Sequence, residues 1–278
     1  MPELPEVETV CRSLAPFIVG KRVSECLIGE EKLIKSSKGD EFINKIIGRT
    51  FTAIKRKGKY ILLLLDDGET LVVHLRMTGK LLISLKDEPV NKHTHVRFSF
   101  EDCEQELRYE DIRKFGILYL GDEAKLAQLK GLANLGYEPL SEEFTTEVLK
   151  EILHSSNKKI KAVLLDQTKI AGIGNIYADE ILFQAKIHPE SIAKNITDEE
   201  VIEALHFAIQ DRLREGIKYG GSSIKDYVNS FGEAGSFQKL HKVYAKAGER
   251  CVECGGILDK MTSAGRSSTY CPNCQIKY

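Results

Sequence analysis

Four cysteines near the C-terminal end of the chain follow the pattern Cys251-x2-Cys254-x16-Cys271-x2-Cys274. Two Cys-x-x-Cys turns at this separation can present their thiolates tetrahedrally to one Zn²⁺, closing a β-hairpin too small to bury its own core. A site closed by four sulfur atoms leaves no position for water, so this zinc would be structural and not catalytic. The alternatives are disulfides or unligated thiols, but in a reducing compartment the spacing favours zinc.

The other three cysteines, Cys11, Cys26 and Cys103, are scattered through the first half of the chain. An odd number of separated cysteines is typical of reduced thiols in the cytosol. The acidic N-terminus lacks the basic and apolar regions of a secretory signal. The longest apolar run, Ile61 to Leu65, is far too short to cross a bilayer. We therefore expect a cytoplasmic protein that has no membrane partner.

The length and composition predict a globular protein with more than one core. A chain of 278 residues is long enough for two domains, and its 42% hydrophobic and 29% charged content excludes a disordered chain. The formal net charge is only −1, but its distribution is uneven. Residues 236–278 hold seven Lys/Arg against three Asp/Glu, whereas residues 121–156 hold three against seven. A neutral total can therefore hide one basic and one acidic face.

The first half of the chain is predicted to form one helix followed by short strands. An apolar stripe at spacings of three and four predicts the helix: Val7, Val10, Cys11 and Leu14. The runs YILLLL and TLVVHL flank an Asp66-Asp67-Gly68 turn, which indicates a hairpin, and THVRFSF alternates as a half-buried strand does. With FGILYL as a further run, these strands favour a β-sandwich or barrel over roughly residues 1–130.

The second half has helical signals after an irregular linker, GLANLGYEPLSEE. Residues 159–166 and 176–185 each fit a helix. The stretch Thr197-Asp198-Glu199-Glu200 has the form of a capping box. The residues after it are apolar on one face and predict a third helix.

The first residues, MPELPEVETV, are only partly explained by a helix start. Pro5 suits a first helical turn, and Glu6 and Glu8 complement the positive end of the helix dipole. Neither reason accounts for Pro2 or Glu3. If Met1 is removed, Pro2 becomes an N-terminal secondary amine. An α-amino group titrates at about 8, so a useful fraction is unprotonated at neutral pH.

Seven motifs occur along the chain in one order: PELPEVET, KGKY (57–60), HLRMTGK (74–80), DIRKFG (111–116), AGIGNIYADE (171–180), GGSSIKDYVNSFGEAGSFQ (220–238) and the cysteine finger. Together they resemble bacterial formamidopyrimidine-DNA glycosylase over nearly the whole chain. The resemblance implies a two-domain α+β fold that binds DNA between its lobes. Its parts are an N-terminal catalytic β-sandwich domain with a flanking helix (1–130), a linker (131–145), a helix–two-turn–helix DNA-binding domain (146–236) and a β-hairpin zinc finger (237–278).

The resemblance also implies base-excision repair by a bifunctional enzyme, a DNA glycosylase and AP lyase acting as a monomer on double-stranded DNA. It would remove oxidised purines such as 8-oxoguanine and formamidopyrimidines, then cleave the strand by β,δ-elimination. Pro2 would form a Schiff base with the sugar, and Glu3 would protonate the deoxyribose ring oxygen. Lys59 would contact a phosphate and assist catalysis, while Arg266 would grip the phosphate at the lesion.

Six further residues match DNA contacts of the family. The resemblance implies that Met77, Arg113 and Phe115 fill the gap left by the everted base, although Met77 and Phe115 could otherwise be strand core. Asn175 would hold a phosphate at a helix N-terminus, and His74 and His93 would touch the backbone. Departures from the family pattern lie at Tyr137, Ala245-Lys246 and Ser267–Thr269, outside the residues to which the resemblance gives a role.

Two other functions are consistent with parts of this pattern. Endonuclease VIII is a related glycosylase that uses the same nucleophile on oxidised pyrimidines; PELPEVE, HLRMTG and the long loop at 220–238 favour the purine enzyme. A non-catalytic damage-binding zinc-finger protein is the alternative of another class, but a passive binder has no need of an unblocked Pro2.

Overall fold

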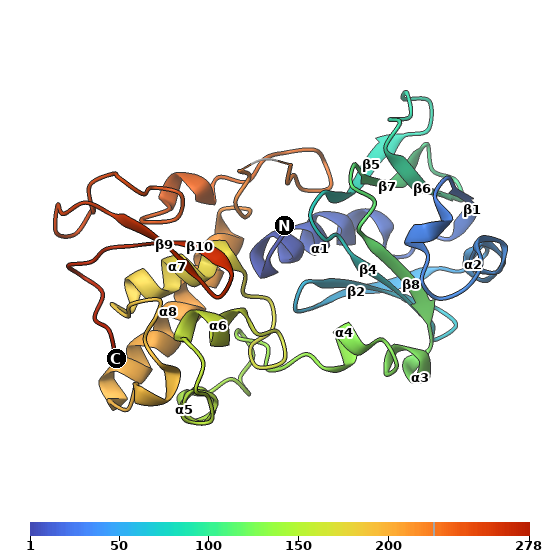
Figure 1. Cartoon of the computed structure of the whole chain (residues 1–278). Coiled ribbons are helices and arrows are strands. Elements are labelled where there is room, and N and C mark those ends of the chain that lie inside the picture. The colour runs from blue at the N-terminus through green and yellow to red at the C-terminus, as the bar shows by residue number, and fades with distance from the viewer. Residues whose placement is uncertain (225) are drawn as a thin grey trace. The chain divides into compact units, whose positions relative to one another are not determined.

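The computed structural model describes residues 1–224 and 226–278. Contacts between residues divide the chain into two compact units. Figure 1 shows the whole chain, coloured from blue at the N-terminus to red at the C-terminus. The first unit consists of Met1–Ala133 and Tyr219–Ser236, and the second of Asn134–Lys218 and Phe237–Tyr278. Segment 219–236, which the sequence places with the helical domain, therefore makes its contacts with the first unit.

The first unit contains two four-stranded sheets with antiparallel strand pairs, ordered β1-β6-β7-β5 and β2-β3-β4-β8. The strands are β1 (Val23–Ile28), β2 (Phe51–Lys57), β3 (Tyr60–Leu65), β4 (Thr70–His74), β5 (Gly79–Leu85), β6 (Thr94–Phe100), β7 (Gln105–Asp111) and β8 (Ile117–Gly121). The helices are α1 (Leu4–Ile18), α2 (Gly39–Ile46), α3 (Glu123–Leu126) and α4 (Lys130–Ala133). This arrangement confirms the predicted β-sandwich with a flanking helix.

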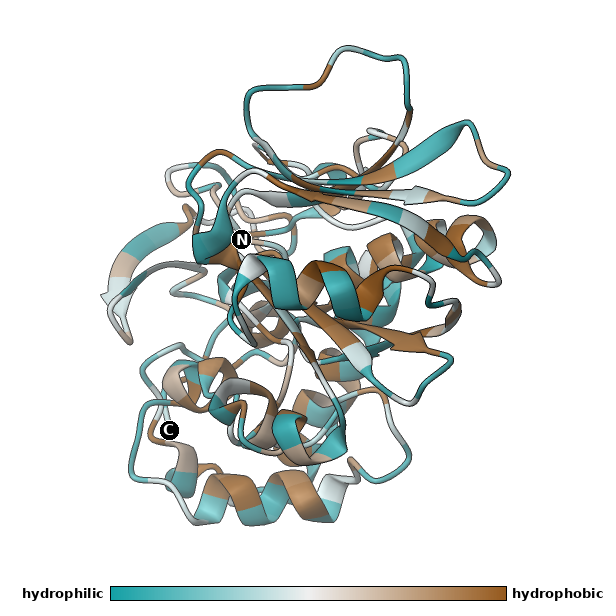
Figure 2. Ribbon diagram, turned by 90° about the vertical axis from the view of Figure 1, so that its right-hand side faces the viewer, coloured by the Kyte–Doolittle hydropathy of each residue, from teal (hydrophilic) through white to brown (hydrophobic). Residues whose placement is uncertain are grey.

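One hydrophobic core joins helix α1 to both sheets. The predicted stripe of α1 is buried in it, with Val7, Val10 and Leu14 at most 2% exposed. The alternating residues of β6, Val96, Phe98 and Phe100, are buried in the same core. Figure 2 shows the corresponding alternation of polar and apolar segments along the helix beside the N-terminus. The periodicities of the sequence therefore identify the core-facing residues of this unit.

The second unit is built from helices α5 (Thr146–His154), α6 (Ile160–Leu165), α7 (Asn175–Gln184) and α8 (Glu199–Lys218). The predicted helices at 159–166 and 176–185 are thereby confirmed. The cap of α8 lies one residue later than expected: Asp198 directly precedes the helix, and its Oδ1 accepts from the Glu200 N–H at 2.9 Å. Residue 201 is a valine, so Asp198 forms a single cap bond and not a capping box. A carboxylate at this position caps as well as a threonine hydroxyl does, so Asp198 takes the place expected of Thr197.

A two-stranded antiparallel hairpin, β9 (Asp259–Ser263) and β10 (Arg266–Tyr270), ends the second unit. The buried cluster around it holds Phe183, Val243, Cys251, Leu258 and Cys271, so two of its five members are cysteines. Such a core is too small to stabilise the hairpin alone. Within the described residues, the chain has no helix with the length and apolar character needed to cross a membrane.

Candidate catalytic and DNA-binding site

The N-terminal end of the chain is clamped at the start of α1. Glu3 is the N-cap residue and forms a capping box with Glu6; the Glu3 N–H donates to Glu6 Oε2 at 2.8 Å. Pro2 is buried, and Glu3 and Glu6 are only 3% and 1% exposed. The clamp therefore fixes the backbone of the two residues that a simple helix start does not explain.

The other oxygen of Glu6 binds segment 219–236. Glu6 Oε1 accepts from the Ser222 N–H at 2.7 Å, and the Tyr227 hydroxyl donates to the Glu6 carbonyl at 3.2 Å. Gly221 has a φ of +79°, and a Cβ there would lie 2.8 Å from Glu6 Cγ, so this approach requires glycine. One buried carboxylate thus joins the N-terminus to the segment that resembles the family's covering loop.

Lys59 lies at the β2–β3 turn, where Gly58 takes the left-handed conformation (φ +56°). Its side chain is buried within the first unit, and its charge acts on His74 at the end of β4. Burial, with the nearby charges of Arg76 and Lys59, lowers the pKa of His74 to about 3. The neutral imidazole accepts from the Arg76 N–H through Nδ1 at 3.0 Å. The structure therefore places His74 under the β4–β5 loop, with only 6% of its surface exposed.

Met77, Arg113 and Phe115 come together at the surface of the first unit and are called here the loop cluster. They belong to the β4–β5 and β7–β8 loops. The Arg113 guanidinium lies 4.8 Å from the centre of the Phe115 ring, and its Nη1 lies 3.1 Å from Met77 Sδ. Met77 is 45% and Phe115 54% exposed, so the strand-core alternative for these two residues is wrong. His93 contacts the same region through its carbonyl, which accepts from the Asp111 N–H at 3.0 Å.

In the second unit, a cavity of about 380 Å³ opens beside the first residue of α7. Its lining includes Asn175, Asp179, Tyr244, Lys260, Ser267 and Thr269. Asn175 Nδ2 donates to the Ser267 carbonyl at 3.0 Å, whereas its buried Oδ1 has no hydrogen-bond partner among the described residues. Exposed Arg266 begins β10, directly before Ser267. A helix N-terminus with polar and cationic neighbours can bind an anion such as phosphate.

Two acidic residues of α7 hold the segments that line this cavity. Asp179 Oδ1 accepts from Lys161 Nζ at 2.6 Å and from the Ser268 hydroxyl at 2.7 Å, and Asp179 Oδ2 accepts from the Thr269 N–H at 3.1 Å. The carboxylate of Glu180 accepts from three consecutive backbone N–H groups, Lys242 to Tyr244, at 2.8–3.0 Å. Both carboxylates are almost fully buried, so α7 orients the hairpin that carries Arg266.

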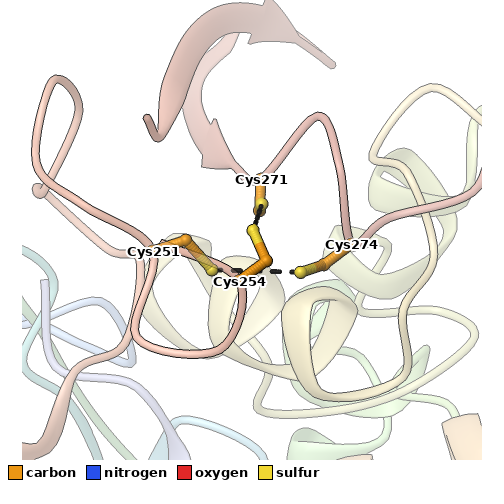
Figure 3. Close-up of side chains that lie close together, drawn as sticks. All are labelled: Cys251, Cys254, Cys271 and Cys274. Atoms are coloured by element: carbon orange, nitrogen blue, oxygen red, sulfur yellow. Dashed lines mark hydrogen bonds between the residues drawn. The ribbon is translucent and has the colours of Figure 1, made fainter. Parts of the chain in front are cut away.

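The four cysteines of the finger converge on one point (Figure 3). All their sulfur atoms lie within 4.8 Å of one another; Cys251 and Cys274 are 3.9 Å apart, and Cys254 and Cys271 3.5 Å. Tetrahedral zinc with Zn–S bonds of about 2.3 Å requires sulfur atoms about 3.8 Å apart. A hydrogen bond from the Gly256 backbone, with others from Cys271 and Cys274, lowers the pKa of Cys254 to about 6, which favours the thiolate. The residues therefore fit one structural Zn²⁺.

Family models match three successive parts of the chain. Residues 1–118 match the formamidopyrimidine-DNA glycosylase N-terminal domain, and residues 135–228 match the H2TH domain of the same enzyme. Residues 248–276 match the zinc finger found in FPG and IleRS. The chain belongs to the formamidopyrimidine-DNA glycosylase family.

Bacterial members of the formamidopyrimidine-DNA glycosylase family match the chain from end to end. The enzyme of Carboxydothermus hydrogenoformans is 49% identical, and the alignment covers 99% of this chain and all of the relative. That of Bacillus cereus strain E33L is 47% identical over 99% of both chains. The structure of a Lactococcus lactis FPG point mutant in complex with Fapy-dG-containing DNA has a TM-score of 0.92 at 39% identity, covering 99% of this chain and all of the other.

The sequence motifs did not identify five residues of this cavity and its supports as site residues: Lys161, Asp179, Glu180, Tyr244 and Lys260. One signal was available: AGIGNIYADE places two adjacent acids in a helix whose other faces are largely apolar. Acids in such a helix are buried, and buried carboxylates need donors. Apart from Lys161, which precedes α7, the donors come from segments more than 60 residues further along the chain.

We expect Asp179→Asn to destabilise the second unit by about 3–5 kcal/mol, because it leaves the fully buried Lys161 ammonium without its carboxylate. Urea unfolding measures the change. The double variant Asp179→Asn/Lys161→Met removes the unpaired charge and should recover most of the stability. Its DNA affinity should remain below that of the unsubstituted protein, because asparagine retains only one of the two acceptor oxygens that Ser268 and Thr269 use. A double variant as unstable as the single one would contradict this explanation.

Proposed function

We propose that this protein removes oxidised purines from double-stranded DNA and then nicks the strand, with Pro2 as the nucleophile. The observation that carries the proposal is the clamp that Glu3 and Glu6 form at the N-terminus. Nucleophilic catalysis requires a reacting nitrogen held in a fixed position. The full-length similarity to formamidopyrimidine-DNA glycosylases, whose solved complexes contain Fapy-dG or abasic-site DNA, supports the same reaction class.

The first step requires removal of Met1. The unprotonated Pro2 nitrogen then attacks C1′ of the damaged nucleotide, forming an N–C bond as the bond to the base breaks. When the sugar ring opens, the secondary amine becomes an iminium that has no N–H proton to lose and stays cationic. This electron sink acidifies C2′, so the 3′ phosphate is eliminated first and the 5′ phosphate second.

Glu3 is the residue proposed to move protons during these steps. It is adjacent to Pro2 in the chain and can protonate the deoxyribose ring oxygen as the ring opens. Lys59 is buried in the same unit and is proposed to contact a phosphate and assist catalysis. Arg56, which directly precedes the KGKY stretch, pairs with Glu8 at 2.9 Å.

The remaining predicted residues are proposed to hold the DNA. The loop cluster would fill the space left by the everted base, with its methionine and phenylalanine wedged between base steps. Arg113 would form hydrogen bonds with the cytosine that is left unpaired opposite the lesion. Asn175 and Arg266 would bind phosphates beside the α7 N-terminus. His74 would act on the DNA through the β4–β5 loop that covers it, and His93 would touch the DNA backbone. The zinc ion would keep the Arg266 hairpin folded.

The domain boundaries, the monomeric state and the cytoplasmic location remain part of this proposal. The uneven charge supports DNA binding by the finger region, where Lys and Arg are in excess. Zinc binding by cysteine thiolates is consistent with a reducing compartment, and so is the scattered placement of Cys11, Cys26 and Cys103 along the chain.

The test compares excision of 8-oxoguanine opposite cytosine with excision of thymine glycol, each with borohydride present. We expect faster excision of 8-oxoguanine and a covalent protein–DNA product whose adduct maps to Pro2. Preference for thymine glycol would instead support an endonuclease VIII-like enzyme. Absence of any covalent product from protein with confirmed removal of Met1 would support the non-catalytic damage binder.

A further inference from the structure

Asp111, the last residue of β7, has a fully buried carboxylate that lies directly behind the loop cluster. Its Oδ1 accepts from the Thr78 hydroxyl at 2.5 Å and from the Arg113 N–H at 3.1 Å. Thr78 follows Met77 in the β4–β5 loop. One oxygen atom therefore bonds to both loops that form the cluster.

The second oxygen of Asp111 holds the far end of the β7–β8 loop. Oδ2 accepts from the Gly116 N–H at 2.8 Å and from the Tyr109 hydroxyl at 3.3 Å. A Cβ at Gly116 would lie only 1.6 Å from that hydroxyl, so the arrangement requires glycine there. Because Arg113 N–H and Gly116 N–H are on either side of Phe115, the carboxylate fixes the loop before and after the exposed ring.

The chemistry of this arrangement requires a carboxylate. Asp111 faces four donors, and an ionised carboxylate can accept from all of them because it carries no proton of its own. An asparagine would turn an N–H₂ group toward two donors on whichever side it occupied. A buried carboxylate is costly unless such donors surround it, so the bonds to the two loops compensate for its burial.

We propose that Asp111 is a positioning residue that holds Met77, Arg113 and Phe115 in the arrangement that recognises the base opposite the lesion. This inference rests on the proposed function of the loop cluster. Asp111 itself would touch neither the DNA nor the reacting atoms. Its effect should appear in discrimination between opposite bases and not in the chemistry at Pro2.

The test is Asp111→Asn, measured on three substrates. We expect the ratio of 8-oxoguanine excision opposite cytosine to that opposite adenine to fall at least about fivefold, because the Arg113 contact to the orphaned base loosens. Cleavage of an abasic site in single-stranded DNA should stay within about twofold, since that substrate has no opposite base to recognise.

Glu106→Gln is the matched control. Glu106 is also a fully buried carboxylate of β7, but it pairs with Arg97 and Arg108, and among the described residues it has no hydrogen bond to either loop. We expect it to lower the unfolding temperature while leaving the opposite-base ratio unchanged. If Asp111→Asn does not fold, Thr78→Val removes the hydroxyl that donates to Asp111 and accepts from the Arg113 N–H, and it should lower the ratio in the same direction.

An unchanged ratio in whichever Asp111 or Thr78 variant folds would overturn the inference. Equal losses on the duplex and on the single strand would also overturn it, because they would place Asp111 in general support of the catalytic residues. Failure of the unsubstituted protein to cleave any of the three substrates would instead refute the proposed function, so the two failures are distinguishable.

Discussion

A chain that keeps any residue in front of Pro2 should lose base excision and borohydride trapping by at least about 10³-fold, as expected when an enzyme loses its nucleophile. An amide nitrogen in place of the amine cannot attack C1′ or form an iminium. The experiment uses a protein with an N-terminal tag and the same protein after the tag has been cut to expose Pro2. Intact mass confirms each form, and single-turnover excision of 8-oxoguanine measures the rates.

The matched control for this prediction is Glu3→Gln, which retains the Pro2 amine. We expect it to slow base excision while still giving a covalent product on a preformed abasic site, because proton transfer and nucleophilic attack belong to different groups. Comparable crosslinking by the tagged and cut proteins would contradict the prediction. In that case mapping of the adduct would show whether Lys59 supplies the attacking amine.

Loss of the zinc site should have the second largest effect. Metal binding contributes about 10–16 kcal/mol to folding in small zinc fingers, and the cluster around this hairpin has only five buried residues, two of them ligands. We expect Cys271→Ser to bring the zinc content from about one ion per chain to near zero and to weaken DNA binding at least about 100-fold. Metal analysis and titration with labelled duplex check both results.

Cys103→Ser is the control for the zinc prediction. Cys103 is a partly buried free thiol of the first unit and should leave zinc content and affinity unchanged. In the Cys271→Ser variant, the slope of log affinity against log salt concentration should also fall by about 1. This is the change expected for the loss of one phosphate contact, because Arg266 is no longer held in place. Undiminished affinity in zinc-free protein would exclude a role of the finger in binding.

Local patterns in the sequence account for much of the fold. The stripe from Val7 to Leu14 and the alternation from Val96 to Phe100 identify buried faces, because side-chain direction repeats with a fixed period in each type of element. The Asp66-Asp67-Gly68 turn joins adjacent strands, so its signal is also local. The displaced cap at Asp198 shows the limit of such signals: the element is identified correctly, but its first residue is wrong by one.

Some residues of the candidate site can be predicted from local sequence patterns, whereas others can be recognised only in the tertiary structure. The Cys-x-x-Cys spacing alone predicts a tetrahedral metal site, and the four sulfur atoms lie close together as expected. In contrast, nothing local distinguishes Met77 and Phe115 from strand core, and only their exposure excludes that interpretation. Asp111 is part of a motif, yet its bond to Thr78 joins residues 33 positions apart.

By itself, the sequence determined the zinc ligands and the type of the helices and strands that have a clear apolar pattern, and it predicted Pro2 as an attacking amine. Those properties follow from residue spacing and side-chain type, which can be read from the sequence without knowledge of the fold. Only the tertiary structure decided which buried carboxylates hold the site: Glu6 bonds to Ser222, Asp111 to Thr78, and Asp179 to Ser268. Each of these acids needs donors once water is excluded, and folding alone selects the distant segment that supplies them.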